Sequence, residues 1–336
     1  MVTIKDIARE SGYSISTVSR VLNHQRDVSP VARKKIEEIV EFYHFVPNNN
    51  AKHLKQAASK TVGILLKGTS NMLFASILEV IQKRVAGAAY TSFVLYLDED
   101  ADEVEQAKIL CRERKPLGIL FLGGNPENFK RGFASIEIPC VLVTNKAGGM
   151  NFPNLSSVST DDITAAKCAV DELIHNGHNR IGIIGGDLHS SHTSKERYQG
   201  CKESFEENHV QLKLDDYYEK ARFSYDSAYQ AAKRLLGRRK DITAIFAMSD
   251  VMAVGVIRAL RDMGYVVPDD ISVIGFDGTE YAKYYNPQIA TVKQQSETLA
   301  TKSVDILFYQ LEQERKPVHE IVPFEFVSGE SIRKMN

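Results

Sequence analysis

Hydroxyl and guanidinium side chains gather in a short segment near the N-terminus. Ser16 and Arg20 lie four residues apart, so on a helix they share one face, opposite the apolar Val18 and Leu22. An exposed arginine can donate two hydrogen bonds to O6 and N7 of guanine, and Ile15 can pack against a thymine methyl group. For a generic helix the same side chains would form a solvated surface. Base recognition therefore depends on whether the neighbouring elements present this helix to DNA.

Capping residues and apolar periodicity predict three short helices around this segment. The first ends near Gly12, the second runs from Ser14 to Asn23, and the third begins at the Ser29-Pro30 pair. Only two residues join the first two helices, which suits a helix-turn-helix, and in that motif the second helix lies in the major groove. We expect the third helix to reach about Tyr43 and to direct inward Val31, Ile36, Ile39, Val40 and Tyr43.

The charge distribution agrees with a phosphate-binding head but does not prove one. Residues 1–60 carry ten Lys or Arg against six acidic residues, whereas the rest of the chain carries 32 against 37. A basic head on an acidic body is typical of a nucleic-acid-binding module joined to a regulatory domain. A solvated helical face explains the charge equally well.

Other function classes find little support. The four cysteines are far apart and form no C-x-x-C pair, which argues against a zinc site, a redox motif or a disulfide framework. There is no nucleophile–base pair and no phosphate-binding loop, so we expect neither an enzyme nor a cofactor. His189 and His192 lie in a polar loop, where solvation is favoured over metal binding. Lacking a signal peptide and a membrane-length apolar run, the chain is expected in the cytoplasm with no membrane partner.

From Thr61 onward, apolar strands alternate with amphipathic helices. This alternation predicts an α/β domain with two parallel sheets. The strand candidates are 61–66, 92–97, 117–122, 140–143, 181–186, 243–248 and 271–276. Ligands of such sheets bind at the carboxyl ends of the strands, and polar residues follow these runs, among them Lys67, Asn71, Asp187 and Asp277.

Three ordered runs carry a close resemblance. The segments TIKDIARESGYSISTVSRVLN, VSPVARKKI and FVPNNNAKHL resemble the DNA-binding head of the lactose-repressor (LacI/GalR) family. Further matches at 173–186, 249–280 and 286–295 resemble that family's effector domain, so the resemblance covers essentially the full chain. It implies a helix-turn-helix head at 1–46, a hinge at 47–60 and a two-lobed effector domain like the periplasmic sugar-binding proteins. The lobes are expected at 61–160 with about 292–320 and at 161–291 with about 321–336.

The resemblance also assigns the DNA contacts. Ile15, Ser16 and Arg20 are implied as the main major-groove residues, and a hinge helix over Asn48 to Ala57 is implied to form on the operator. Leu54 matches the leucine that enters the minor groove, where an exposed apolar side chain among polar neighbours makes a good wedge. About ten residues make a marginal helix, so we expect this one to order only on DNA. The full expected set is Ile15, Ser16, Thr17, Ser19, Arg20, Asn23, Asn48, Ala51, Lys52, Leu54 and Lys55.

For the effector site, Arg197 and Asp277 match polar clamps on ligand hydroxyls. Phe223 matches an aromatic that stacks on a sugar ring, and Phe74 is placed to close the other lobe. Weaker matches are Asp161, Ser249 and Asp250. Capping or core roles explain each of these residues about as well.

These assignments predict a homodimeric repressor of a pseudo-palindromic operator on double-stranded DNA, with a carbohydrate as the small-molecule effector. A purine, another metabolite or a protein corepressor are alternative signals. An extracytoplasmic sugar receptor is a rival function, against which the basic head and the absent signal peptide argue.

Overall fold

The computed structural model describes residues 4–22, 25, 28–43, 60–68, 71–313 and 316–335. The chain divides into two compact units, Met1–Ser59 and Lys60–Asn336. Each unit has its own buried core, so each is described separately below.

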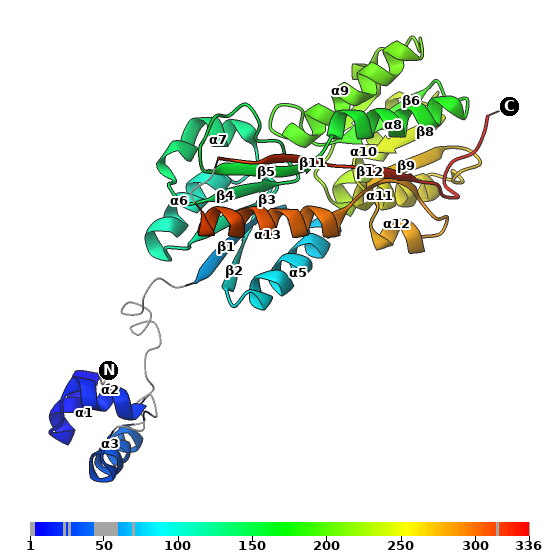
Figure 1. Ribbon diagram of the computed structural model, residues 1–336. Coiled ribbons are helices and arrows are strands. Elements are labelled where there is room, and N and C mark those ends of the chain that lie inside the picture. The colour runs from blue at the N-terminus through cyan, green and yellow to red at the C-terminus, as the bar shows by residue number, and fades with distance from the viewer. Residues whose placement is uncertain are drawn as a thin grey trace. The chain divides into compact units, whose positions relative to one another are not determined.

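The first unit contains three helices, α1 (Ile4–Ser11), α2 (Ile15–Leu22) and α3 (Pro30–Phe42) (Figure 1). As expected, Ser29 caps α3 by accepting a hydrogen bond from the Ala32 amide at 3.3 Å, and proline follows it at the first helical position. Small apolar side chains from all three helices meet in one core, namely Ile7, Ala8, Val18, Val21 and Ile36.

The inward face of two helices differs from the expectation. In α2 it is Val21 that is buried beside Val18, and Leu22 is only partly buried. Val31 was expected inside but is 75% exposed, and Tyr43 also lies at the surface. In both helices the buried residues are those that face the neighbouring helices. The spacing of apolar residues in the sequence does not by itself determine which side of a helix faces its neighbours.

The first lobe of the second unit is built on six neighbouring parallel strands. Their order is β11 (His319–Val322), β5 (Leu155–Thr160), β4 (Cys140–Val143), β3 (Gly118–Leu122), β1 (Thr61–Lys67) and β2 (Thr91–Leu97). Helices α5 (Met72–Gly87) and α13 (Ser296–Glu312) pack side by side on one face, although more than 200 residues separate them (Figure 1). Helices α6 (Glu103–Glu113) and α7 (Pro126–Gly132) cover the other face. Both faces are buried, which explains why the strands read as nearly continuous apolar runs.

The second lobe repeats this plan. Its strands are β12 (Phe324–Val327), β10 (Ala290–Gln294), β9 (Ser272–Asp277), β8 (Ala244–Ala247), β6 (Ile181–Gly185) and β7 (Tyr218–Lys220), with β12 antiparallel to β10. Its helices are α8 (Asp162–His175), α9 (His192–Glu207), α10 (Tyr225–Arg238), α11 (Asp250–Asp262) and α12 (Glu280–Tyr284). All seven expected strands are present, and the predicted fold class is confirmed.

The chain passes between the two lobes three times. The passages follow β5 at Asp161, β10 at Gln295 and β11 at Pro323 (Figure 1). These three connecting segments join the lobes along one side. The loops that follow the parallel strands of both sheets meet around a shared cavity. This topology is what places residues distant in sequence on facing walls.

Candidate functional site

The second helix of the first unit presents a polar outer face. Ile15 is 46% exposed, and Ser16 and Arg20 are exposed as well, whereas Thr17 and Ser19 are partly buried. The Ser14 hydroxyl accepts a hydrogen bond from the Thr17 amide at 3.1 Å, so it caps the helix where the sequence indicated. The remaining expected DNA contacts lie outside the described residues: Asn23, Asn48, Ala51, Lys52, Leu54 and Lys55.

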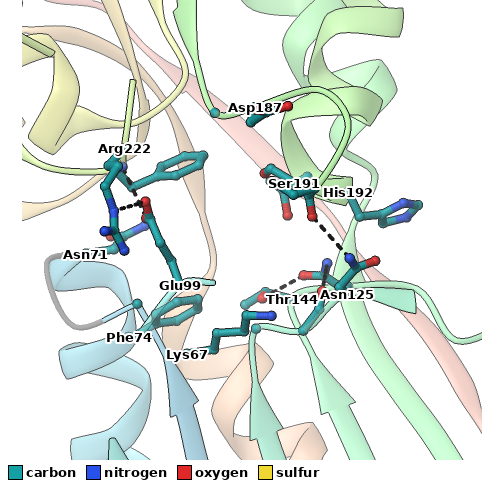
Figure 2. Close-up of a pocket in the computed structure, with 18 of the residues that line it drawn as sticks. Lys67, Asn71, Phe74, Glu99, Asn125, Thr144, Asp187, Ser191, His192 and Arg222 are labelled. Atoms are coloured by element: carbon teal, nitrogen blue, oxygen red, sulfur yellow. Dashed lines mark hydrogen bonds and ion pairs between the residues drawn. The ribbon is translucent and has the colours of Figure 1, made fainter. Parts of the chain in front are cut away.

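In the second unit, a cavity of about 550 Å³ lies between the lobes at the carboxyl ends of the strands. Its volume is typical of a small-molecule site. Of the expected ligand residues, the cavity brings together Phe74, Arg197, Phe223 and Asp277. Figure 2 shows that polar side chains of both lobes face this space, including Lys67, Glu99, Asn125, Thr144, Asp187 and Arg222.

Arg197 is a buried cation held from several sides. Its side chain is only 4% exposed, and Nε donates to Oδ1 of Asp162 at 2.7 Å. Nη1 donates to the Met248 carbonyl, and the guanidinium carbon lies 3.6 Å from the centroid of the Phe276 ring. These contacts fix the plane of the guanidinium, so its remaining N–H groups are aimed before any ligand arrives.

Asp277 is the counterpart acceptor. Its Oδ1 accepts from the Gln294 amide at 2.8 Å and lies 3.9 Å from Arg197, and its Oδ2 accepts from Asn71 of the other lobe at 3.1 Å. Burial raises the pKa of Asp277 to about 6, although Arg197 opposes the shift. Its φ of 114° is a strained conformation for a residue with a side chain. Such strain persists only where surrounding contacts hold it.

Two aromatic rings reach the cavity from opposite lobes. Phe74 comes from the first turn of α5, and Phe223 comes from the loop that follows β7. Both are partly buried and therefore keep ring surface available to the cavity. A flat apolar surface on each wall suits a ring-shaped ligand.

The lobes also touch directly at the rim of the cavity. Arg222 of the second lobe pairs with Asp98 at 2.6 Å and with Glu99, both from the loop after β2. Figure 2 shows Arg222 and Glu99 facing each other. Asn125 donates to the Ser190 carbonyl at 3.2 Å. These contacts link the two lobes directly at the edge of the cavity.

A buried ion pair lies at the end of β1. The Lys67 ammonium is 2.6 Å from Oε2 of Glu103, whose side chain is fully buried. Glu103 also accepts from the Asn125 amide at 2.6 Å and from Asn128 at 3.1 Å. Among the residues that the structure describes, no group of three His, Cys, Asp or Glu is placed to hold a metal ion.

Three expected ligand residues lie away from the cavity lining. Asp161 pairs with Lys146 at 2.9 Å at the start of α8, and Ser249 caps α11 by accepting from the Met252 amide at 3.3 Å. Asp250 is buried and accepts hydrogen bonds from Thr279 and Thr291. Burial, reinforced by the charge of Asp277, raises the pKa of Asp250 to about 7. Of the three, only Ser249 has the capping role that competed with ligand binding. Asp161 stands at the N-cap position of α8 without a side-chain cap hydrogen bond, and Asp250 is bound by threonines outside α11.

Several lining residues had no role assigned from sequence: Glu99, Asn125, Thr144, Arg222 and Gln294. Glu99, Asn125 and Thr144 lie within three residues of the end of an expected strand, so the strand-end rule was the available signal for these three. Arg222 follows β7 and Gln294 ends β10, two strands that the sequence did not predict. Lys67 and Asp187 were noted by that rule alone. His192 also lines the cavity, and burial lowers its pKa, which favours the neutral imidazole.

Comparison with known proteins settles the family. A family profile described as bacterial regulatory proteins of the lacI family matches residues 3–48, and a periplasmic binding protein-like domain matches 170–332. The HTH-type transcriptional regulator MalR of Clostridium butyricum is 36% identical over 98% of this chain and 99% of its own. The chain belongs to the lacI family of bacterial regulatory proteins.

Solved structures of transcription regulators show the same fold. The transcriptional regulator CelR–cellobiose complex aligns with a TM-score of 0.72 and 24% identity, covering 98% of this chain and 100% of that one. The lac repressor dimer bound to operator and the anti-inducer ONPF aligns with a TM-score of 0.70 and 23% identity, covering 99% of each.

As a lacI-family member the chain is a DNA-binding transcriptional regulator and not an enzyme. Within the described ranges, none of the helices has the length and apolar character needed to cross a membrane.

Proposed function

We propose that this regulator represses transcription as a homodimer on a pseudo-palindromic operator, and that a carbohydrate in the interlobe cavity changes its operator affinity. Residues 1–46 form the DNA-binding head, residues 47–60 the hinge, and the two lobes of Lys60–Asn336 the sensor. The regulator acts in the cytoplasm of a bacterium, where its operator lies.

On the DNA side, the proposal assigns base contacts to Ile15, Ser16 and Arg20. Their exposure on the face of α2 opposite the core supports this assignment. Arg20 supplies the strongest discrimination, because a bidentate pair with guanine rejects other bases. Thr17, Ser19 and Asn23 flank these contacts. Leu54 of the hinge wedges into the minor groove at the operator centre, Ala51 lets two hinge helices approach, and Asn48, Lys52 and Lys55 contact the backbone.

On the ligand side, the observation that carries the proposal is the cavity with Arg197 and Asp277 at its base and an aromatic ring on each wall. Hydroxyl groups both donate and accept, so they match a fixed guanidinium beside a carboxylate. Carbon-rich faces of a sugar ring match Phe74 and Phe223. The similarity to a structure with bound cellobiose supports the same ligand class.

The two sites are coupled because the ligand touches both lobes. Sugar binding changes the angle between the lobes, and that change alters how the paired hinge segments meet the operator. Couplings of this kind are worth about 1–3 kcal/mol, or roughly 5- to 150-fold in affinity.

The test begins with operator selection from random duplex DNA by the purified full-length chain. Operator affinity is then measured by fluorescence anisotropy with maltose, cellobiose, glucose, guanine or hypoxanthine present. A change of about fivefold or more with a sugar and none with the nucleobases supports the proposal. A response confined to a nucleobase would contradict the carbohydrate assignment, and failure to select any sequence would contradict the DNA contacts.

A further inference from the structure

We propose that the cavity accepts an electrically neutral sugar, and that buried Glu103 excludes phosphorylated and carboxylated sugars by neutralising Lys67. This inference rests on the proposed sugar-binding function and adds the charge of the ligand to it. Neither residue was assigned a role from the sequence.

Each cationic side chain in the described lining already has a carboxylate within ion-pair distance. Lys67 has Glu103 at 2.6 Å, and Arg197 has Asp162 at 2.7 Å. Lys220 has Asp187 at 3.0 Å, and Arg222 has Asp98 at 2.6 Å as well as Glu99. A phosphate or carboxylate on the ligand would therefore have to compete with a resident partner for every cation.

Acidic groups outnumber the cations around the cavity. The lining contains five carboxylates, Asp98, Glu99, Asp100, Asp187 and Asp277. Glu103 and Asp162 stand directly behind it and bring the total to seven against four cations. An anionic ligand would meet net repulsion in a site partly shielded from water, where charge interactions are stronger than in solution. Neutral hydroxyls escape this penalty, because they accept from the cations and donate to the carboxylates.

The ion pair of Lys67 with Glu103, at the end of β1, belongs to the cavity wall that the first lobe contributes. The Lys67 side chain is 12% exposed and lines the cavity, while Glu103 lies behind it with no exposed surface. Hydrogen bonds from Asn125 and Asn128 hold the Glu103 carboxylate in place (Figure 2 shows Lys67 and Asn125 on this wall). A buried carboxylate with three donors stays beside Lys67 whatever the ligand does. The Glu103 carboxylate is thus a fixed part of the wall behind Lys67.

The experiment compares matched ligands by isothermal titration calorimetry on the full-length chain: maltose with maltose 6′-phosphate, and glucose with glucose 6-phosphate and glucuronate. We expect the native chain to bind a neutral sugar at least about tenfold more tightly than its anionic derivative. In Glu103→Gln the amide oxygen still accepts from the Asn125 amide, but Lys67 keeps an uncompensated charge. The ratio of the two dissociation constants, anionic sugar to neutral sugar, should then fall by about tenfold.

The matched control is Glu105→Gln on the same helix, whose exposed side chain pairs with Lys108 outside the cavity lining. In this control the ratio of the two dissociation constants should equal that of the native chain. Should thermal melts show that Glu103→Gln does not fold, Asp187→Asn gives the same charge test at Lys220, which also lines the cavity and lies 3.0 Å from the Asp187 carboxylate. Native binding of an anionic sugar as tight as that of its neutral partner, or an unchanged ratio in a folded variant, overturns the inference alone. Absence of binding by every sugar overturns the carbohydrate function together with it.

Discussion

At the scale of single residues, the two proposed sites contain an arginine in different surroundings. Arg20 stands on an exposed helix face, whereas Arg197 is buried between carboxylates and an aromatic ring. An arginine on an exposed face can be reached by a base edge, whereas a buried one has its orientation fixed by the residues around it. The different surroundings suit recognition of DNA in one case and of a small polar molecule in the other.

Replacing Arg20 by alanine tests the recognition helix. Because the bidentate contact with guanine is lost, Arg20→Ala should weaken binding to the selected operator by about 1–3 kcal/mol and relax specificity at one base pair. Fluorescence anisotropy with operator and with unrelated duplex measures both effects. Arg9→Ala, which removes an exposed cation paired with Asp6 on α1, is the control and should retain the base preference. Unchanged operator binding by Arg20→Ala would show that the helix assignment is wrong.

The buried carboxyl groups Asp250 and Asp277 make stability depend on pH. Their pKa values in the folded chain are about 7 and about 6, well above the ordinary 3.8, chiefly because of burial. The folded state therefore binds more protons than the unfolded state between about pH 4 and 7, so their contribution to stability falls as the pH rises through this range.

The variant Asp250→Asn removes one titrating group and its charge next to Asp277. The free energy of unfolding of this variant, minus that of the native chain, should increase as the pH is raised from 5 to 8, because the native chain loses stability over this range. Urea unfolding at a series of pH values measures this difference. A difference that does not vary with pH would mean that the pair does not titrate in this range.

At the scale of elements, close helix packing depends on glycines that leave room for a neighbouring backbone. In α11, a Cβ built on Gly255 would lie 2.3 Å from the Tyr225 carbonyl oxygen at the start of α10. A backbone atom cannot rotate away as a side chain can, so the two helices would have to separate.

Gly255→Ala should therefore destabilise the chain by about 1–3 kcal/mol. The matched control is Gly237→Ala in α10, where no atom lies within 4 Å of the added carbon. There alanine should be neutral or stabilise by up to about 1 kcal/mol through its better helix propensity. Denaturant unfolding measures both variants, and equal effects would contradict the packing argument.

The hinge segment, which lies outside the described residues, is tested through the shape of the operator. Leu54→Ala removes the proposed wedge and should reduce both DNA bending and operator affinity, because the kink is no longer filled by an apolar side chain. Energy transfer between dyes at the two operator ends reports the bend. Lys55→Ala, which removes a proposed phosphate contact, should weaken binding to every sequence and make operator affinity less dependent on salt concentration. A bend that Leu54→Ala leaves unchanged would rule out the wedge.

At the scale of the whole molecule, we expect ligand affinity to depend on how readily the lobes close. Arg222 joins the second lobe to Asp98 and Glu99 of the first at the cavity rim. Exposed ion pairs are individually weak, so Arg222→Ala should raise the Kd of the bound sugar by only about two- to fivefold. Calorimetry measures this, with small-angle scattering of the ligand-free chain as a check on lobe opening. Arg234→Ala, whose partner Glu219 lies in the same lobe, should leave both unchanged. The same result for both variants would exclude a closing role for Arg222.

Much of the architecture was predictable because its signals are local. The Ser14 and Ser29 caps, the short turn at Gly12 and the apolar strand runs depend on neighbours a few residues away, and they placed the helix-turn-helix and seven strands. Short strands such as β7 and β12 were not anticipated, since a few residues without strong alternation carry little signal.

The chemical content of the cavity depended on tertiary structure. Sequence by itself determined that polar residues follow the strands and that Arg197 and Asp277 were candidates for one site. Only the folded chain, with its three passages between lobes, decided that Asp250 turns inward to Thr279 and Thr291 while Asp277 faces Arg197. It likewise decided that Glu103 stands behind Lys67, because these residues lie 36 positions apart and meet only when α6 packs across β1. Capping and periodicity are set within one element, whereas the charge of a cavity is set by the side chains that several elements bring together.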